Sequence, residues 1–180
     1  MKYKVVKFIT EEQIEKRVKE LGEIITKEYS GKSLKLIGVL KGCVPFFCKL
    51  MQNIDNPNLT IDFMAVSSYG SGTSSSGIVK ILKDLDTNIE GENVIIAEDI
   101  IDSGHTFAKL IDLLSVRNPK SLKVCTLLDK PTRREVDIKP DYVGFAIEDK
   151  YVVGYGMDYN QYYRQLPYIG EVIFEDTKKS

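Results

Sequence analysis

Apolar positions near the start of the chain recur with the spacing of one helix face. Thr10 and Gln13 match a capping box, in which a hydroxyl and an amide side chain satisfy backbone groups at a helix start. Hydrophobic side chains then return every three or four residues, at Ile14, Val18, Leu21, Ile24 and Ile25. This period predicts an amphipathic helix over 11–29.

Shorter apolar runs fill the rest of the chain up to about residue 147. They predict strands at 34–40, 61–67, 79–82, 93–101, 122–128 and 142–147 and helices at 46–51 and 107–116. Residues 70–77 contain only Gly, Ser and Thr, a composition too poor in apolar atoms to pack, so we expect a mobile loop there.

Strand and helix patterns alternate, which predicts an α/β fold: a mostly parallel, twisted sheet with helices on both faces. Ligands of such sheets bind at the carboxyl ends of the strands. The last segment, 151–180, is rich in Tyr and turn residues and is expected to form a small hood with the N-terminus. We therefore predict a single domain over 1–180, with a core of about 30–150 and a hood from about 1–10 and 151–180.

Composition and charge narrow the function. The 180 residues are 43% hydrophobic, and 25 Lys and Arg face 26 Asp and Glu, so the net charge of −1 gives no reason to expect nucleic acid as a partner. The longest apolar runs are far shorter than the roughly 20 residues that cross a bilayer. The N-terminus lacks the pattern of a secretory signal, so we expect a cytoplasmic protein without a membrane partner.

The residue types available for catalysis are few. Three cysteines, Cys43, Cys48 and Cys125, lie in apolar surroundings without C-x-x-C spacing, which is typical of buried thiols in a reducing compartment. His105 is the only histidine, so mechanisms that need two imidazoles are excluded. Carboxylates are the remaining candidates.

The most informative segment is 98–106, in which a buried strand runs into acids, then a glycine turn, then a helix. Gly104 permits a tight turn, and the amides at a helix start would point at one spot, as in an anion site. The hydroxyls of Ser103 and Thr106 add two donors. Asp102 would repel a phosphate there, so its carboxylate is expected to point toward a reacting group or a hydroxyl. The turn predicts a phosphomonoester site.

Two acids precede this turn. Glu98 and Asp99 are adjacent on a strand, so their side chains point to opposite faces unless the strand bends at its end. At a strand end they could share a ribose diol and its Mg²⁺, an ion that proteins hold with few carboxylates, water and substrate phosphates. The alternative is that they only solubilise the strand end.

The segment 98–106 resembles the phosphoribosyl pyrophosphate signature of type I phosphoribosyltransferases, and the whole chain is similar to their hypoxanthine-guanine branch. Further matching pieces, in order, are Leu40-Lys41-Gly42, Ser67-Ser68-Tyr69-Gly70, Leu128-Asp129-Lys130, the stretch 151–159 and Arg164. Ser103 stands where many relatives have Thr, and His105, which could tune phosphate affinity with pH, where others have Lys, Arg or Leu. The resemblance implies that ribose 5-phosphate passes to hypoxanthine or guanine in purine salvage, with Mg²⁺ as cofactor, in a homodimer or homotetramer.

The resemblance also implies residue roles. The 5-phosphate site would comprise Asp102, Ser103, Gly104, His105 and Thr106, and the pyrophosphate site Lys41, Gly42 and Arg164. The purine site would comprise Lys130 at O6, Tyr151 stacked on the ring, the Val152 carbonyl and Asp158. Mg²⁺ would be held by Glu98, Asp99 and, at a second position, Asp158. Asp102 would be the catalytic residue, as general base or by orienting the purine through N7. Ser68 and Tyr69 would begin a lid.

Three other functional interpretations agree less well with the sequence. Asp102-Ser103-Gly104 fits an aspartic protease signature, but the helix predicted after Thr106 contradicts that all-β fold. An RNA-binding regulator on the same scaffold would need a basic face, and the clusters at 130–134 and 178–179 are short. The Walker A, G-x-G-x-x-G and G-x-S-x-G patterns are absent, which argues against P-loop kinases, Rossmann dehydrogenases and α/β-hydrolases.

Overall fold

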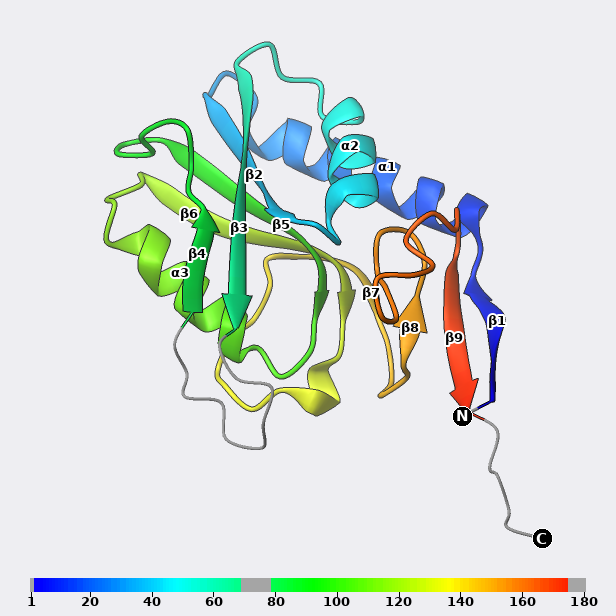
Figure 1. Cartoon of the computed structure of the whole chain (residues 1–180). Coiled ribbons are helices and arrows are strands. Elements are labelled where there is room, and N and C mark those ends of the chain that lie inside the picture. The colour runs from blue at the N-terminus through cyan, green and yellow to red at the C-terminus, as the bar shows by residue number, and fades with distance from the viewer. Residues whose placement is uncertain (1, 69–78, 175–180) are drawn as a thin grey trace, which may run out of the picture.

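The computed structural model describes residues 2–68 and 79–174 and shows a large sheet, a small sheet and three α-helices (Figure 1). The elements are β1 (Tyr3–Ile9), α1 (Glu11–Glu28), β2 (Leu34–Leu40), α2 (Val44–Gln52), β3 (Leu59–Ser68), β4 (Val79–Lys83), β5 (Asn93–Ile101), α3 (His105–Ser115), β6 (Ser121–Asp129), the 3₁₀ turn η1 (Pro131–Arg133), β7 (Tyr142–Ala146), β8 (Val152–Val153) and β9 (Ile169–Phe174). The predicted α/β class is confirmed.

The large sheet has the order β4-β3-β2-β5-β6-β7, and every pair is parallel except β3 with β4. From β2 the chain continues through β3 to β4 at one edge of the sheet. From β5 it continues through β6 to β7 at the opposite edge. The neighbours β2 and β5 pair from Lys35 with Val94 to Gly38 with Ala97, and no pairing between them is recorded beyond Ala97. Their carboxyl ends leave a gap of the kind in which α/β sheets bind ligands.

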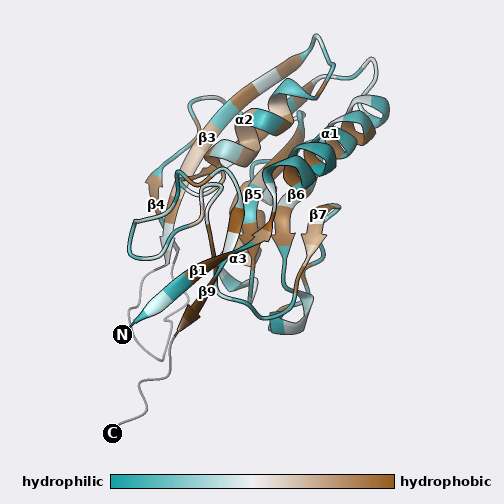
Figure 2. Ribbon diagram, turned by 90° about the vertical axis from the view of Figure 1, so that its right-hand side faces the viewer, coloured by the Kyte–Doolittle hydropathy of each residue, from teal (hydrophilic) through white to brown (hydrophobic). Residues whose placement is uncertain are grey.

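The two faces of the large sheet bury different helices, because successive residues of a strand point to opposite faces. Ile95 and Ala97 pack in one cluster with α1 and α2, whereas Val94 and Ile96 pack in another with α3. In Figure 2 the central strands are hydrophobic, and the side of α1 turned toward the viewer is largely polar. Helices therefore cover both faces, as predicted.

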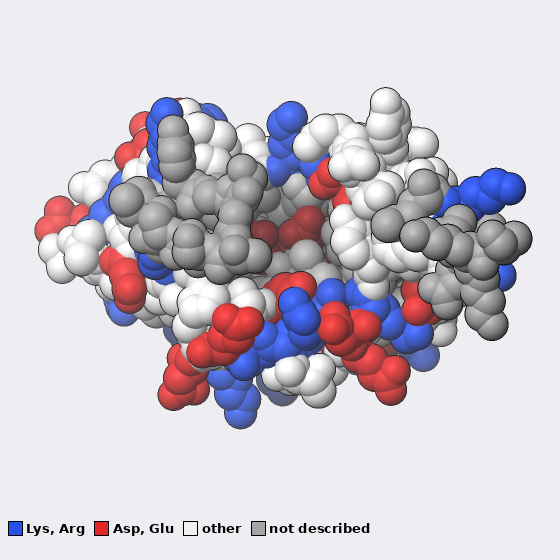
Figure 3. Space-filling view, turned by 60° about the horizontal axis from the view of Figure 1, so that its bottom comes forward, with Lys and Arg blue, Asp and Glu red and all other residues white. Residues whose placement is uncertain are grey.

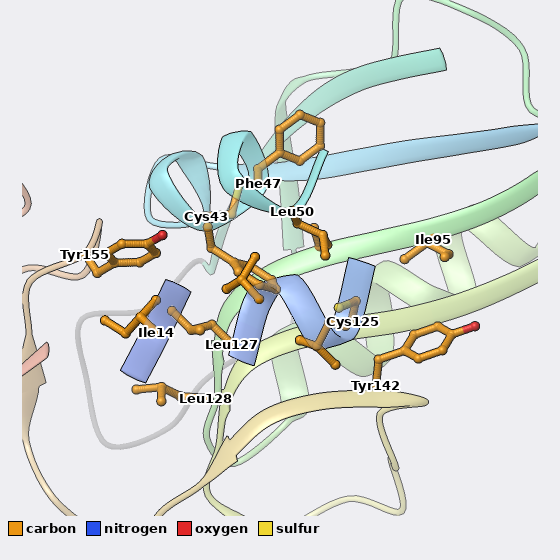
Figure 4. Packing of buried hydrophobic residues seen from close by; sticks show 14 of the residues in the cluster. Ile14, Cys43, Phe47, Leu50, Ile95, Cys125, Leu127, Leu128, Tyr142 and Tyr155 are labelled. Carbon is orange, nitrogen blue, oxygen red and sulfur yellow. The ribbon is translucent and has the colours of Figure 1, made fainter. Parts of the chain in front are cut away.

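The helix α1 begins where the capping box predicted. The Gln13 amide donates to the Thr10 hydroxyl, and the Gln13 side chain accepts from the Thr10 amide. Its apolar face carries Ile14 into the cluster of Figure 4, close to Leu127 of β6, and Phe47 of α2 belongs to the same cluster. The hydrophobic core against the large sheet thus includes residues of α1, which lie before the predicted core range of about 30–150.

The hood is a small antiparallel sheet of order β1-β9-β8, built from both terminal segments (Figure 1). Tyr3 of β1 pairs with Phe174 of β9, and β8 follows the large sheet by a short connection. Ile9 and Ile169 link the hood to the core cluster that contains α1. The hood predicted from the termini is confirmed.

The structure also bears on the predicted burial of the cysteines and on the hydrophobicity of the helices. Cys43 and Cys125 are buried free thiols, but Cys48 is exposed on α2, so its predicted burial is wrong. Its position on that helix faces away from the apolar side formed by Phe46, Phe47 and Leu50. Among the described residues, no helix combines the length and the hydrophobicity that crossing a bilayer requires.

Candidate active site

The candidate site lies at the carboxyl ends of β2 and β5, where the chain leaves the large sheet in opposite directions. The turn after β5, Asp102 to Gly104, leads into α3, and the turn after β2, Lys41 to Gly42, leads toward α2. Seen from this edge, the molecule has a central hollow with acidic residues at its floor (Figure 3). Two adjoining cavities open there.

The first cavity contains the predicted phosphate turn. It has a volume of about 250 Å³, and the turn residues Ser103, Gly104 and Thr106 line it together with Glu98. Gly104 has a φ of 88°, a left-handed conformation that glycine adopts without a Cβ clash, and α3 begins at the next residue. The amide end of α3 and two hydroxyls therefore border a space that can accept an anion.

His105 is the residue of this turn whose side chain lies elsewhere. Its Nε2 is 2.8 Å from Glu135 Oε2, the imidazole is half exposed, and the side chain lines neither cavity. Its backbone amide remains at the start of α3, as the predicted phosphate site requires. The imidazole therefore does not line the predicted phosphate cavity, and the idea that it tunes phosphate affinity with pH stays a prediction.

Glu98 and Asp99 lie side by side but open to different cavities. Glu98 lines the first cavity and Asp99 the second, as alternation along the strand requires. Burial, together with the negative charge of Asp99, raises the pKa of Glu98 well above its usual range. Burial also raises the pKa of Asp99, while backbone donors and Arg164 act in the opposite direction. Both residues are only partly exposed and line cavities, which argues against the interpretation that they only solubilise a strand end.

These acids fit the predicted magnesium ion. Oε2 of Glu98 is fully buried and has no hydrogen-bond partner among the described residues, and the partly exposed carboxylate of Asp99 lies beside it. No cluster of three or more His, Cys, Asp or Glu able to hold a metal occurs among the described residues. A pair of carboxylates that leaves the remaining positions to water and substrate is typical of Mg²⁺ rather than of a closed structural metal site.

The turn after β2 is held by a close approach of backbone and acid. A Cβ at Gly42 would lie 1.7 Å from Asp99 Oδ2, and a Cβ at Gly156 would lie 1.9 Å from the Gly42 carbonyl oxygen. Asp99 and the segment after β8 therefore press on Gly42 from two sides. Lys41, which precedes it, is exposed at the edge of the site.

Arg164 lies in the hood and contacts this turn only indirectly. Its Nη1 donates to the Gly156 carbonyl at 2.7 Å, and its Nη2 lies 2.6 Å from Asp158 Oδ1. Oδ2 of Asp158 accepts from the Gln161 amide. The predicted pyrophosphate role of Arg164 and metal role of Asp158 stay predictions, since here the two residues pair with each other.

The second cavity brings together the predicted purine residues. It has a volume of about 220 Å³ and is lined by Asp99, Ile100, Asp102, Lys130, Tyr151, Val152, Met157 and Asp158. Asp102 and Ile100 line both cavities and so form the wall between them. The Tyr151 ring packs T-shaped against Tyr159 and Phe174, with centroids 5.6 and 6.1 Å away, and 47% of the residue is exposed, so it is accessible to another ring.

The cations and acids at this cavity form a closed ring of ion pairs. Lys130 Nζ lies 3.5 Å from Asp102 Oδ2 and 3.7 Å from Asp149 Oδ1, and Arg133 lies 3.2 and 3.4 Å from the other oxygens of the same two acids. Only 8% of the Lys130 side chain is exposed. The basic cluster 130–134 is therefore largely neutralised by acids and does not form a free basic face.

Sequence reasoning missed the segment Arg133 to Glu135, which touches the phosphate turn from behind, and also Asp149 and Gly156. The only signal for the segment was its run of three charged residues, which is indistinguishable in sequence from a solvated surface turn. Of the predicted lid, Ser68 is the last residue of β3, and Tyr69 and the loop 70–77 lie outside the described residues.

Comparisons with known proteins agree with this geometry. The family model of the phosphoribosyl transferase domain matches residues 6–160. The hypoxanthine-guanine phosphoribosyltransferase of Bacillus subtilis is 55% identical over 171 residues, 94% of this chain and 94% of that protein. The hypoxanthine phosphoribosyltransferase of Salmonella typhimurium is 52% identical over 178 residues, 98% of this chain and 99% of that protein. A crystal structure of a hypoxanthine-guanine phosphoribosyltransferase from Bacillus anthracis, with HEPES in its active site, has a TM-score of 0.89 at 46% identity, covering 96% of this chain and 100% of that one.

Proposed function

The chain belongs to the phosphoribosyl transferase family, and on that premise we propose that it transfers 5-phosphoribosyl from phosphoribosyl pyrophosphate to hypoxanthine or guanine. The products would be IMP or GMP and pyrophosphate, so the reaction is a pentosyl transfer in purine salvage. The observation that carries the proposal is the pair of cavities that share Asp102. One has the donors for a 5-phosphate, and the other has a buried cation and an aromatic ring for a purine.

Base recognition would follow from the second cavity. Lys130 is a donor without acceptor capacity, so it favours a keto oxygen at C6 over the amino group of adenine. The exposed face of Tyr151 would stack on the ring, and the Val152 carbonyl would accept from its Watson–Crick edge. Asp102, between the cavities, would orient the ring through N7 or take its proton.

Sugar activation would depend on the first cavity and the acid pair. Positive charge grows on the ribose as pyrophosphate leaves, so the site must hold both anionic groups still and stabilise the departing charge. The turn 103–106 would hold the 5-phosphate, and Lys41 with the Gly42 backbone would bind pyrophosphate. When bound, Mg²⁺ would neutralise pyrophosphate charge, held by Glu98 and Asp99 and, at a second position, by Asp158. The lid that begins at Ser68 and Tyr69 would exclude water.

The test is an assay of pyrophosphate release. Purified protein is incubated with phosphoribosyl pyrophosphate and Mg²⁺ and, in turn, hypoxanthine, guanine, xanthine, adenine or uracil, with a chelator-treated sample as control. We expect hypoxanthine or guanine to be consumed, adenine and uracil to be inert, and the chelator to abolish turnover. If neither 6-oxopurine is consumed, the proposal fails.

The proposal extends to the setting of the reaction. The described residues contain three free cysteines and no disulfide, which suits a reducing compartment, and we place the enzyme in the cytoplasm. A homodimer or homotetramer is proposed by family resemblance. No observation favours the RNA-binding alternative.

A further inference from the structure

The phosphate turn is attached from behind to a segment that the proposed function does not use. The segment Arg133 to Glu135, called the backing segment below, begins three residues after Lys130, the residue proposed to read the base. Nη1 of Arg134 donates to the Asp102 carbonyl at 2.8 Å. The Glu135 amide donates to the Ser103 carbonyl at 3.0 Å. Two successive carbonyls of the turn are thus held by two successive residues of the backing segment.

These two bonds fix where the turn's amides point. In a planar trans peptide the C=O and the following N–H point to opposite sides. Holding the Asp102 carbonyl toward Arg134 therefore aims the Ser103 amide the other way, and holding the Ser103 carbonyl aims the Gly104 amide away from the backing segment. That direction leads to the first cavity, which Ser103 and Gly104 line. Neither amide has a hydrogen-bond acceptor among the described residues.

Arg134 is itself held rigidly. Nη2 pairs with Oδ1 of Asp129, and only 13% of the Arg134 side chain and 12% of the Asp129 side chain are exposed. Its Cδ would lie 3.1 Å from a Cβ at Gly104, so it packs directly beneath the turn. Arg134 lines neither cavity and does not reach a ligand in them. Its effect on a ligand must pass through the turn.

We propose that Arg134 is a positioning residue for the 5-phosphate site: by holding the Asp102 carbonyl, it aims the Ser103 amide into the first cavity before a ligand arrives. This inference deepens the proposed function and rests on it. A preorganised donor binds an anion without an ordering cost, whereas a peptide free to rotate must be ordered each time. Losing one such charge-assisted restraint corresponds to about a tenfold loss of affinity or more.

The test compares two ligands that use different turns. Binding of IMP, which carries a 5-phosphate, and of pyrophosphate with Mg²⁺ is measured by calorimetry in the whole protein, with melting temperature recorded for each variant. Arg134→Gln removes the guanidinium. Asp129→Asn keeps an oxygen that can accept from Arg134, and it keeps the bond from Arg134 to the Asp102 carbonyl. It leaves the buried Arg134 guanidinium without its counter-charge. It is the matched control for stability.

We expect Arg134→Gln to weaken IMP binding by about tenfold or more and pyrophosphate binding by less than about threefold. Asp129→Asn should lower the melting temperature but keep IMP affinity within about threefold. Equal losses for the two ligands in Arg134→Gln, or equal IMP losses in both variants, would overturn the inference and leave Arg134 a purely structural residue.

A second pair of variants covers the case in which Arg134→Gln does not fold. Glu135→Pro removes the amide that donates to the Ser103 carbonyl, and Arg134 already has the extended ψ of 125° that a following proline favours. Glu135→Ala keeps that amide and removes only the carboxylate that pairs with His105. Selective loss of IMP affinity in the proline variant supports the inference that bonds from the backing segment to the turn's carbonyls aim its amides at the ligand, and identical behaviour of the two variants contradicts it. If the wild-type protein turns over no 6-oxopurine, the proposed function fails instead.

Discussion

The two turns at the centre of the site are stabilised in opposite ways. The turn after β5 is held by donors: Arg134 and the Glu135 amide bind two of its carbonyls, and α3 starts at its end. The turn after β2 is held by contact, because Gly42 leaves room for the Asp99 carboxylate and touches Gly156 of the hood. One turn depends on hydrogen bonds and the other on missing side chains.

This difference matches the groups that the turns are proposed to bind. The 5-phosphate stays bound through the reaction, and a turn with amides fixed by the backing segment suits a permanent contact. Pyrophosphate leaves, and its turn is packed between Asp99 of β5 and Gly156 of the hood. At the turn after β5, removing a side chain should therefore lower turnover without weakening binding of phosphoribosyl pyrophosphate. At the turn after β2, adding a side chain should disrupt the turn itself.

The largest effect is expected for Asp102, whose backbone belongs to the phosphate turn and whose carboxylate faces the second cavity. Asp102→Ala keeps the carbonyl that Arg134 binds, so the affinity for phosphoribosyl pyrophosphate should change by less than about threefold. Loss of the purine contact should lower kcat by about 100-fold to 10,000-fold. Steady-state kinetics with both substrates measures the split. Equal losses in kcat and in phosphoribosyl pyrophosphate binding would make the carboxylate structural.

The next effect is expected at the turn after β2. Gly42→Ala would place a Cβ 1.7 Å from Asp99 Oδ2, and that carboxylate is only partly exposed and is held by the Ile100 amide through its other oxygen. Overpacking of this kind costs about 1–3 kcal/mol, and kcat/KM should fall by about 100-fold as Asp99 and Lys41 are displaced.

The control is the double variant Gly42→Ala with Asp99→Ala, in which the clash is removed. Its stability to urea should exceed that of Gly42→Ala, while its activity stays low because the acid is missing. If Gly42→Ala alone keeps the wild-type kcat/KM, the close approach of Gly42 and Asp99 does not shape the pyrophosphate turn.

The same contrast explains what the sequence could predict. The phosphate turn was predictable because strand, acids, Gly104 and helix are consecutive, and each has a local physical reason. The bond from Arg134 to the Asp102 carbonyl spans 32 positions and joins a surface-like charge run to a backbone atom that carries no residue signal. The contact of Gly42 with Gly156 depends on where the hood docks. No local pattern encodes that position.

The fold shows the same limit. The helix over 11–29 and the alternating strands follow from periods of 3.6 and 2, so the structure differs from them mainly at element ends. The hood pairs β1 with β9 from opposite ends of the chain, and a sequence rich in Tyr and turns indicated only that a hood exists. Likewise, Cys48 was expected inside because its neighbours are apolar, although one face of α2 is exposed.

A moderate effect is expected for Lys130, the buried cation of the second cavity. Lys130→Met removes the donor proposed for the purine O6 and should lower kcat/KM for hypoxanthine by about 30-fold, while KM for phosphoribosyl pyrophosphate changes little. Arg133→Gln is the matched control, because it removes the other cation of the same ion-pair ring but does not line the second cavity. Its hypoxanthine kinetics should stay near wild type. An unchanged base profile in Lys130→Met would mean that another group reads O6.

The smallest effect isolates the packing of the phosphate turn on its backing segment. Gly104 and Gly91 both have positive φ, 88° and 71°, but a Cβ at Gly104 would lie 2.9 Å from Val136 Cγ2, whereas a Cβ at Gly91 meets nothing within 4 Å. Gly91→Ala therefore reports the backbone strain alone, about 1–2 kcal/mol. At this chain length that is about 2–8 °C in melting temperature.

Gly104→Ala adds the clash to the same strain, so its melting temperature should fall at least about 3 °C further than that of Gly91→Ala. Because the clash pushes the turn away from Val136 and Arg134, the affinity for IMP should also fall by a few-fold, with no change in Gly91→Ala. Calorimetry and thermal melts of the two variants measure both quantities. Equal melting temperatures, with equal affinities for IMP, would show that the turn yields without strain and that close packing against Val136 and Arg134 does not hold it in place.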